Sequence, residues 1–217
     1  MIVPRDSHNS ALLPVHDLGM TPYRRALDIQ RKAVQEVIAD EPQRLLVAEH
    51  PPVITLGRNS GLEHLHVSSD YLVEKGIELV QTSRGGGITC HFPGQLVIYP
   101  ILRMDRRPGG LRQLVRDLED AAIHALRELG LAARRVQDRP GVWIGARKVA
   151  SIGLALKNWV SYHGLALNVC RDTSLFNLIT PCGLKDVQAT SVHTELNREE
   201  PDMATMKHCL LEHLGKL

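Results

Sequence analysis

Apolar residues in the first part of the chain follow first a helical and then a strand-like spacing. They recur every three or four positions over residues 23–38, directly after Thr21 and Pro22. This spacing predicts an amphipathic helix with Thr21 as its N-cap and Pro22 in its first turn. Two apolar runs follow, at 45–50 and 53–57, with two prolines between them. Because proline cannot donate to a sheet ladder, the prolines bound two separate predicted strands.

In the middle of the chain, the pattern predicts one helix before and one helix after a cluster of glycines. A short helix is expected over residues 68–76, followed by a strand over 77–82 that runs into three consecutive glycines. A second strand, over 95–102, leaves the glycine-rich stretch. Residues 111–129 then show helical periodicity, and Gly130 provides a C-terminal stop.

The pattern becomes strand-rich after Gly141. Three apolar runs, at 141–145, 148–156 and 160–169, are separated by short breaks and predict an antiparallel meander. A final helix is expected from about Pro201. Grouped strands with helices between only some of them predict an α+β fold, a mixed and largely antiparallel sheet packed by helices. The length of 217 residues fits a single domain spanning 1–217.

Composition and charge exclude several classes of protein. The chain is 43% apolar and 23% charged, with a formal net charge of +2, so neither a disordered chain nor a nucleic-acid-binding protein is indicated. The N-terminus lacks a secretory pattern, and no apolar stretch reaches the length of a membrane span. The four cysteines form no CxxC pair, which argues against a zinc site and favours free thiols. We therefore expect a soluble cytoplasmic protein without a metal.

The most unusual stretch is RGGGITCHFPGQ, residues 84–95. Consecutive glycines let the backbone approach a ligand and expose its N–H groups, so the stretch can hold an oxyanion. It lacks both the GK[ST] ending of a P-loop and the GxGxxG spacing of a dinucleotide site. A glycine-rich hairpin turn is the alternative interpretation of the stretch alone.

This stretch and three later ones resemble the lipoyl(octanoyl)transferase family. Residues 84–95 match the family signature R-G-G-x-x-T-x-H-x-P-G-Q, and residues 141–153 hold a lysine three positions before Ser-Ile-Gly. SYHGLALN, at 161–168, and TPCGL, at 180–184, are similar to two further family elements, in the family's order. Two positions depart from the family pattern, because Cys90 stands where an aromatic residue is usual and Phe92 where a glycine is usual.

The resemblance implies an octanoyltransferase whose fold is similar to the catalytic domain of biotin and lipoate protein ligases. Cys182 would be the nucleophile that accepts the acyl group, and Lys148 would lower the pKa of Cys182 and handle protons. The residues implied to bind the substrate are Arg84, Gly85, Gly86, Gly87, Ile88, Thr89, Cys90, His91, Tyr99, Ser151, Ile152, Gly153, His163, Gly164, Leu165 and Ala166.

Elementary chemistry favours a cysteine and a lysine for this reaction. A thiolate is a strong nucleophile near neutral pH, and exchanging one thioester for another costs little free energy. A free cysteine titrates near pH ~8.5, so a nearby ammonium raises its thiolate fraction. The same lysine, once neutral, can deprotonate an acceptor lysine, whose ordinary pKa is about 10.4.

Each of these residues also has a plain structural interpretation. A free cysteine is usually a small buried hydrophobe, but Cys182 lies between a proline and a glycine in a predicted loop. Cys170 and Cys209 are interpreted as structural. Lys148, outside its motif, would be a solvated lysine at a strand edge. His91 and His163 are placed in the wall of the site without a proton-transfer role.

The resemblance further implies a two-step reaction without a cofactor. Octanoyl-acyl carrier protein would donate the acyl group to Cys182. The acceptors would then be lysines of lipoyl domains, in E2 subunits of 2-oxoacid dehydrogenases and in the glycine cleavage H protein. Two alternatives stay open. One is an ATP-dependent lipoate or biotin protein ligase, which needs no cysteine, and the other is an acyl-binding protein without catalysis.

Overall fold

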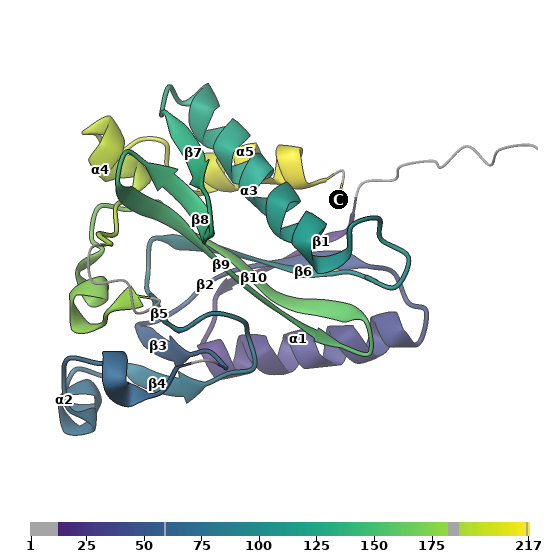
Figure 1. Ribbon diagram of the computed structural model, residues 1–217, viewed down its shortest axis with the longest axis horizontal. Helices are drawn as coiled ribbons and strands as arrows, with labels where there is room; N and C mark the ends of the chain where they lie inside the picture. Colours follow the sequence, from purple (N-terminus) through teal and green to yellow (C-terminus); the bar gives the residue numbers. More distant parts are fainter. Residues whose placement is uncertain (1–12, 59, 182–186, 216) are drawn as a thin grey trace, which may run out of the picture.

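The computed structural model describes residues 13–58, 60–181, 187–215 and 217. Within these residues, seven strands form the larger of two sheets, and all neighbours pair antiparallel except β1 and β2, which are parallel. In spatial order they are β1 (Val15–Met20), β2 (Arg44–Glu49), β6 (Gln95–Ile101), β10 (Val160–Asn168), β9 (Arg147–Lys157), β8 (Arg139–Ile144) and β7 (Ala133–Val136). Figure 1 shows β9 and β10 crossing the centre of the molecule.

A smaller sheet lies beside the larger one. Its order is β4 (Glu78–Gln81), β3 (Val53–Leu56) and β5 (Ile88–His91), with β3 and β4 parallel and β3 and β5 antiparallel. The sequence pattern did not predict β5, because its four residues directly follow the glycines and carry no clear alternation. It also missed the short strand β7, in which two arginines are exposed.

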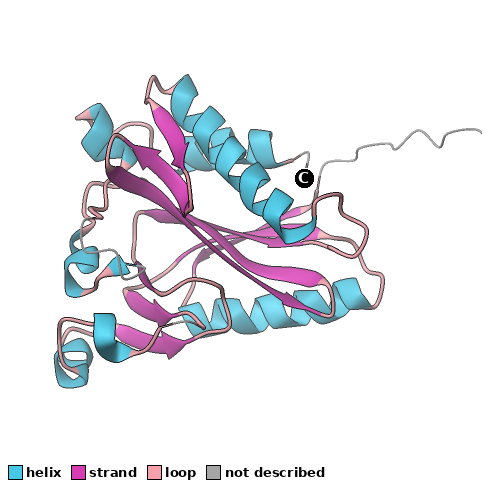
Figure 2. Ribbon diagram, viewed as in Figure 1, coloured by secondary structure: helices cyan, strands magenta, loops and turns pink. Residues whose placement is uncertain are grey.

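Helices cover both faces of the larger sheet (Figure 2). Helix α1 (Tyr23–Ile38) packs on one face, and α3 (Gly110–Glu128) and α5 (Met203–Leu214) on the other. The shorter elements are η1 (Leu62–His64), α2 (Ser69–Glu74), η2 (Ser174–Leu178) and α4 (Val192–Leu196). The predicted N-cap of α1 was wrong by one residue: Pro22 is the N-cap, and the Thr21 hydroxyl instead donates to the carbonyl of Leu18, 2.7 Å away.

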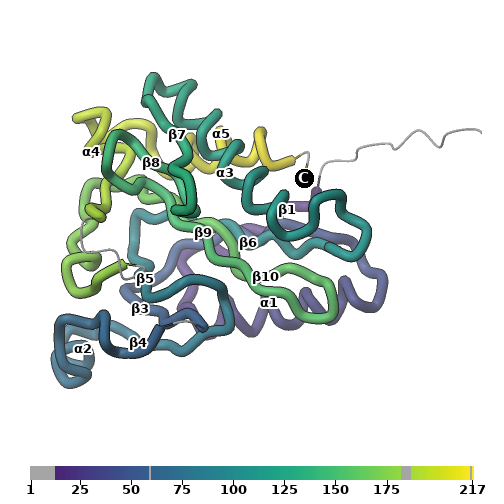
Figure 3. Tube along the Cα trace, viewed as in Figure 1, coloured from purple at the N-terminus to yellow at the C-terminus, as the bar shows by residue number. Residues whose placement is uncertain are grey.

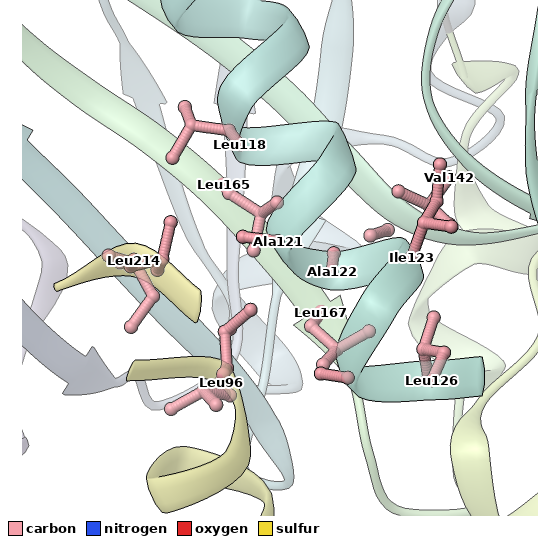
Figure 4. Packing of buried hydrophobic residues seen from close by; sticks show 14 of the residues in the cluster. Leu96, Leu118, Ala121, Ala122, Ile123, Leu126, Val142, Leu165, Leu167 and Leu214 are labelled. Atoms are coloured by element: carbon pink, nitrogen blue, oxygen red, sulfur yellow. The ribbon is translucent and has the colours of Figure 1, made fainter. Parts of the chain in front are cut away.

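The main hydrophobic core lies between the larger sheet and helices α3 and α5. Figure 4 shows Leu118 and Leu126 of α3 beside Leu165 and Leu167 of β10, with Leu214 of α5 close to Leu96. All of these side chains are buried. This packing fixes β10 and its neighbour β9 in place, and both strands contribute to the site described below.

The observed architecture confirms the predicted α+β class with a mixed, largely antiparallel sheet. Figure 3 shows α4 in the upper part of the molecule near β8, and the smaller sheet with β3 and β4 in the lower part near α2. In the part of the chain that is described, no helix combines the length and apolar character that crossing a membrane requires.

Candidate active site

A cavity of about 680 Å³ is lined by residues of both sheets. The smaller sheet contributes β5 and the glycine loop before it, and the larger sheet contributes β6, β9 and β10. Tyr23 of α1, Leu111 and Val115 of α3, and Pro181 also line it. Its wall therefore joins segments that lie far apart in the sequence.

The structure places most of the predicted site residues in this wall. Lys148 lines the cavity, as do all the predicted substrate-binding residues except Cys90. Cys182 lies outside the described residues, but Pro181, which directly precedes it in the sequence, lines the cavity. The glycine loop, the Lys148 and His163 strands and the Cys182 loop were predicted to converge. The first three meet at this cavity, and Cys182 lies outside the described residues.

Cys90 is placed away from the cavity, contrary to its predicted position. Its side chain is fully buried in a hydrophobic cluster with Ile54 and Phe176, and this burial raises the pKa of its thiol well above the ordinary value. Phe92 belongs to the same cluster, and its ring meets that of Phe176 edge-on at 5.9 Å. Thr89 and His91, which alternate with these residues along the chain, line the cavity. Cys90 and Phe92, the two residues that depart from the family pattern, therefore pack in the hydrophobic interior behind the cavity wall.

The glycine loop is fastened on two sides. The N–H of Gly85 donates to the carbonyl of Leu154 in β9 at 2.8 Å, and the N–H of Gly57 donates to the carbonyl of Gly87 at 3.1 Å. A Cβ atom on Gly57 would lie 2.1 Å from the Gly86 carbonyl oxygen, and one on Gly153 would lie 2.9 Å from that of Gly85. Glycines on the flanking segments therefore allow the close approach, and the N–H of Gly85 is already used within the protein.

Arg84 anchors the start of this loop in the smaller sheet. Its guanidinium donates to the Thr55 carbonyl at 2.6 Å and to the Thr55 hydroxyl at 2.8 Å, and the side chain is 7% exposed. A buried arginine held by several acceptors keeps a fixed orientation. Its positive charge therefore stands beside the cavity at a defined place.

Lys148 lies near the beginning of β9 with only 9% of its surface exposed. Its Nζ atom lies over the Trp143 ring, 5.3 Å from the centroid, and Trp143 pairs with Lys148 across β8 and β9. Gly141 has φ +117°, and a Cβ atom there would lie 2.6 Å from Cε of Lys148. Any larger residue at position 141 would therefore clash with the side chain of Lys148.

The backbone of Lys148 pairs with a segment that follows TPCGL. Its N–H donates to the carbonyl of Gln188 at 2.9 Å, and its carbonyl accepts from the N–H of Thr190, also at 2.9 Å. In the sequence, Cys182 therefore stands between Pro181, which lines the cavity, and residues 188–190, which pair with the backbone of Lys148.

A cluster of uncharged aromatic and imidazole rings forms part of the cavity wall and the layer behind it. The rings of Tyr23 and His91 stack at 5.4 Å, and His50 meets both of them edge-on. Nε2 of His50 accepts from the hydroxyl of Tyr99 at 2.6 Å, because Nδ1 donates to the Thr21 carbonyl. Burial lowers the pKa of His50, and burial together with neighbouring His50 lowers the pKa of His91 well below its ordinary value.

His163 belongs to the same wall in a strained backbone conformation. Its φ is +57°, and its N–H donates to the side-chain carbonyl of Gln30 in α1 at 2.8 Å. Burial, followed by the charges of Arg84 and Arg31, lowers the pKa of His163 to about 3. Burial likewise raises the pKa of Tyr23 to about 12. His163 and Tyr23, which both lie within reach of the Arg84 charge, are therefore uncharged near neutral pH.

Tyr23, His50 and Gln30 were not predicted as part of the site or its support. In the sequence, Tyr23 and Gln30 belong to the buried stripe of a helix, and His50 stands at the end of a strand before two prolines. A polar glutamine within an apolar stripe was the one available signal, since a buried amide needs hydrogen-bond partners.

Comparison with solved structures identifies the class of fold. A bipartite lipoate protein ligase of Thermoplasma acidophilum, described with its E2 lipoyl domain, superimposes with a TM-score of 0.73 at 18% identity, covering 94% of this chain and 82% of that chain. The biotin protein ligase of Aquifex aeolicus superimposes with a TM-score of 0.54 at 14% identity, covering 94% and 67%. The fold is that of a lipoate and biotin protein ligase catalytic domain, as predicted.

The sequence comparisons give the family. The family model of the lipoyl protein ligase A/B catalytic domain matches residues 22–215. An octanoyltransferase of Nitratidesulfovibrio vulgaris (strain DP4) is 55% identical over 194 residues, which are 89% of this chain and 89% of the relative. The chain belongs to the lipoyl protein ligase A/B catalytic domain family. These relatives confirm the predicted resemblance to octanoyltransferases and the prediction of an enzyme.

Proposed function

We propose that the chain transfers an octanoyl group from acyl carrier protein to a lysine of a lipoyl domain, by way of a thioester on Cys182. The observation that carries this proposal is the meeting of Lys148 and Pro181 in the wall of one cavity. Pro181 directly precedes Cys182, and the residues paired with the Lys148 backbone follow shortly after. The 55% identical octanoyltransferase supports the same reaction.

The cavity suits an acyl chain followed by a polar head. Val97, Leu165 and Ala166 of the larger sheet supply apolar lining, and Arg84, which is anchored in the smaller sheet, supplies a polar side chain. A volume of about 680 Å³ lies within the range of small-molecule sites in proteins. An eight-carbon chain can therefore be held away from water while its carbonyl carbon reacts.

The reaction proceeds in two transfers. In the first, the Cys182 thiolate attacks the carrier thioester, so that a carbon–sulfur bond forms on Cys182 and the carrier thiolate leaves and takes up a proton. In the second, the neutral amine of the acceptor lysine attacks the Cys182 thioester, an amide forms, and the cysteine thiolate leaves. Lys148 stabilises the thiolate as a cation and accepts the amine proton when neutral.

The acceptors in this proposal are lipoyl domains of E2 subunits and of the glycine cleavage H protein. The Thermoplasma acidophilum ligase described with its E2 lipoyl domain shares the fold and supports acceptors of that kind. We further place the reaction in the cytoplasm, with residues 1–217 acting as one catalytic domain. Cys90, Cys170 and Cys209 are free thiols, as a reducing compartment allows.

Intact-mass measurement tests the proposal directly. With octanoyl-acyl carrier protein and no acceptor, the protein should gain one octanoyl group that hydroxylamine removes. Cys182→Ser should form no thioester, and the control variants Cys170→Ser and Cys209→Ser should label like the unmodified protein. Labelling that persists in Cys182→Ser would contradict the proposal. Octanoylation of the acceptor that requires ATP would instead identify a ligase. Acyl groups that bind to the protein but are never transferred would identify an acyl-binding protein.

A further inference from the structure

A chain of buried hydrogen bonds connects His91 to the segment beside Lys148. Nδ1 of His91 lies 2.7 Å from Oε1 of Gln95, and Nε2 of Gln95 donates to Oδ1 of Asn168 at 2.8 Å. Nδ2 of Asn168 donates to the carbonyl of Thr190 at 2.9 Å. The N–H of Thr190 in turn donates to the carbonyl of Lys148. The side chains of His91, Gln95 and Asn168 are 6%, 1% and 3% exposed.

Backbone carbonyls fix the direction of both amides. A carbonyl only accepts hydrogen bonds, so the Asn168 atom that faces the Thr190 carbonyl has to be its nitrogen. The Gln95 nitrogen also donates to the carbonyl of Cys90 at 3.3 Å, so a flipped Gln95 would set two oxygens against each other. Each amide is therefore oriented by a different backbone group.

The direction of the amides determines the tautomer of His91. Oε1 of Gln95 only accepts, so Nδ1 of His91 has to carry the proton. Burial lowers the pKa of His91 well below the ordinary value, so the ring carries one proton and Nε2 keeps its lone pair. None of the described residues hydrogen-bonds to Nε2, and His91 lines the cavity. The cavity wall therefore offers a hydrogen-bond acceptor at His91.

We propose that Gln95 and Asn168 are positioning residues that hold His91 as an acceptor for a substrate N–H group and tie it to the segment paired with Lys148. The inference rests on the proposed function in one respect, the identity of the donor. A thioester carbonyl cannot hydrogen-bond to an acceptor, whereas the neutral amine of the acceptor lysine can donate one N–H and keep its lone pair for the attack. Gln95 and Asn168 therefore serve the second transfer.

The tautomer can be measured without substrate. In the full chain labelled with ¹⁵N in its histidine rings, the His91 resonances should show a neutral ring protonated at Nδ1 from about pH 8 to about pH 6. Gln95→Leu removes the acceptor and should shift the ring toward protonation at Nε2. Asn168→Asp should keep the Nδ1 proton, because the Cys90 carbonyl still orients Gln95. A ring protonated at Nε2 in the unmodified protein would overturn the inference, whether or not any variant folds.

Separate measurement of the two transfers tests the effect on catalysis. Gln95→Leu should form acyl-Cys182 at the unmodified rate but pass the octanoyl group to a lipoyl domain about tenfold more slowly or worse, as loss of one buried hydrogen bond implies. Gln95→Glu keeps an acceptor for Nδ1 and should retain that tautomer. Its carboxylate raises the pKa of His91, so transfer should fall as pH is lowered, more steeply than in the unmodified protein.

The outcomes distinguish this inference from the proposed function. Equal rates of both transfers in Gln95→Leu, with the tautomer shifted, would overturn the role of His91 as an acceptor and leave the Cys182 thioester intact. Failure to form any acyl-Cys182 in the unmodified protein would overturn the proposed reaction. The tautomer measurement would then still decide whether Gln95 orients His91.

Discussion

The Nζ atom of Lys148 lies 5.3 Å from the centre of the Trp143 ring, and the two residues face each other across neighbouring strands. The face of an indole ring attracts a cation without accepting its proton. Trp143 is itself 2% exposed, so its buried ring presents a fixed surface to the Nζ atom of Lys148. This contact limits the positions that the Lys148 amine adopts and so supports a role for it in chemistry at the cavity.

Substitution of Lys148 should separate its two proposed roles. Lys148→Ala should raise the pKa of Cys182, and each unit of that change weakens the preference for the thiolate by about 1.4 kcal/mol. Lys148→Arg keeps the charge but cannot act as a base in this pH range. The arginine variant should therefore form acyl-Cys182 and accumulate it. Iodoacetamide alkylation across pH measures the first effect and single-turnover mass spectrometry the second. If Lys148→Arg transferred octanoyl groups at the rate of the unmodified protein, Lys148 would not act as the base.

Octanoyl transfer should need neither a nucleotide nor magnesium. The proposed donor, a carrier thioester, already supplies an activated acyl group. The N–H of Gly85 donates to the Leu154 carbonyl at 2.8 Å and is therefore not free for a phosphate. Transfer to a lipoyl domain should be the same after removal of ATP and addition of a chelator. Free octanoate should give no product even with ATP, and its ATP-dependent use would favour a ligase.

Gly141→Ala should impair both stability and transfer. Alanine is strained at φ +117°, and its Cβ would lie 2.4 Å from the Ala150 carbonyl oxygen and 2.6 Å from Cε of Lys148. We expect a loss of about 1–3 kcal/mol in the free energy of unfolding, together with slower transfer. Gly145→Ala is the matched control, because Gly145 has φ +58° with no atom near its Cβ position. It should lose stability but keep its transfer rate, as urea unfolding and transfer assays would show.

The free energy of unfolding should decrease as pH is lowered, because His163 is buried. The pKa of His163 is lowered to about 3, so the unfolded chain binds a proton that the folded chain excludes. This contribution is complete above the unfolded pKa of about 6.5 and is lost as pH falls toward 3, amounting to about 2 kcal/mol between pH ~7.5 and pH ~5. His163→Asn, since asparagine tolerates positive φ, should reduce that dependence in urea unfolding. An unchanged dependence would mean that His163 has the same pKa in the folded and in the unfolded chain.

Local periodicity was enough to predict α1, α3 and the β8–β10 meander. Their apolar residues repeat over many positions, so neighbouring signals reinforce one another. Strand β5 has only four residues, and its assignment to a separate sheet depends on pairing with Val53–Leu56, far away in the sequence. Pairing at such a distance leaves no local signal in a single sequence.

The motifs predicted the residues at the cavity but not the residues that support them. Cys90 shows the limit most clearly, because a motif places a residue in a segment without saying which face of the strand it occupies. Gln30 shows another, since its bond to the His163 backbone joins residues 133 positions apart. Such contacts follow only from the packing of α1 on the larger sheet.

The cavity between the two sheets also has a consequence for heat resistance. Apolar side chains line part of this cavity. An acyl chain held there would pack against them and so extend the hydrophobic interior of the protein. Each methylene group that it buries contributes about 0.8 kcal/mol. A thioester stays attached when the chain unfolds, so its octanoyl chain is exposed to water in the unfolded state and buried in the folded state, which stabilises the folded state. The octanoylated protein should accordingly melt at a higher temperature than the free protein, so the proposed acyl-enzyme would be the more heat-resistant of the two forms.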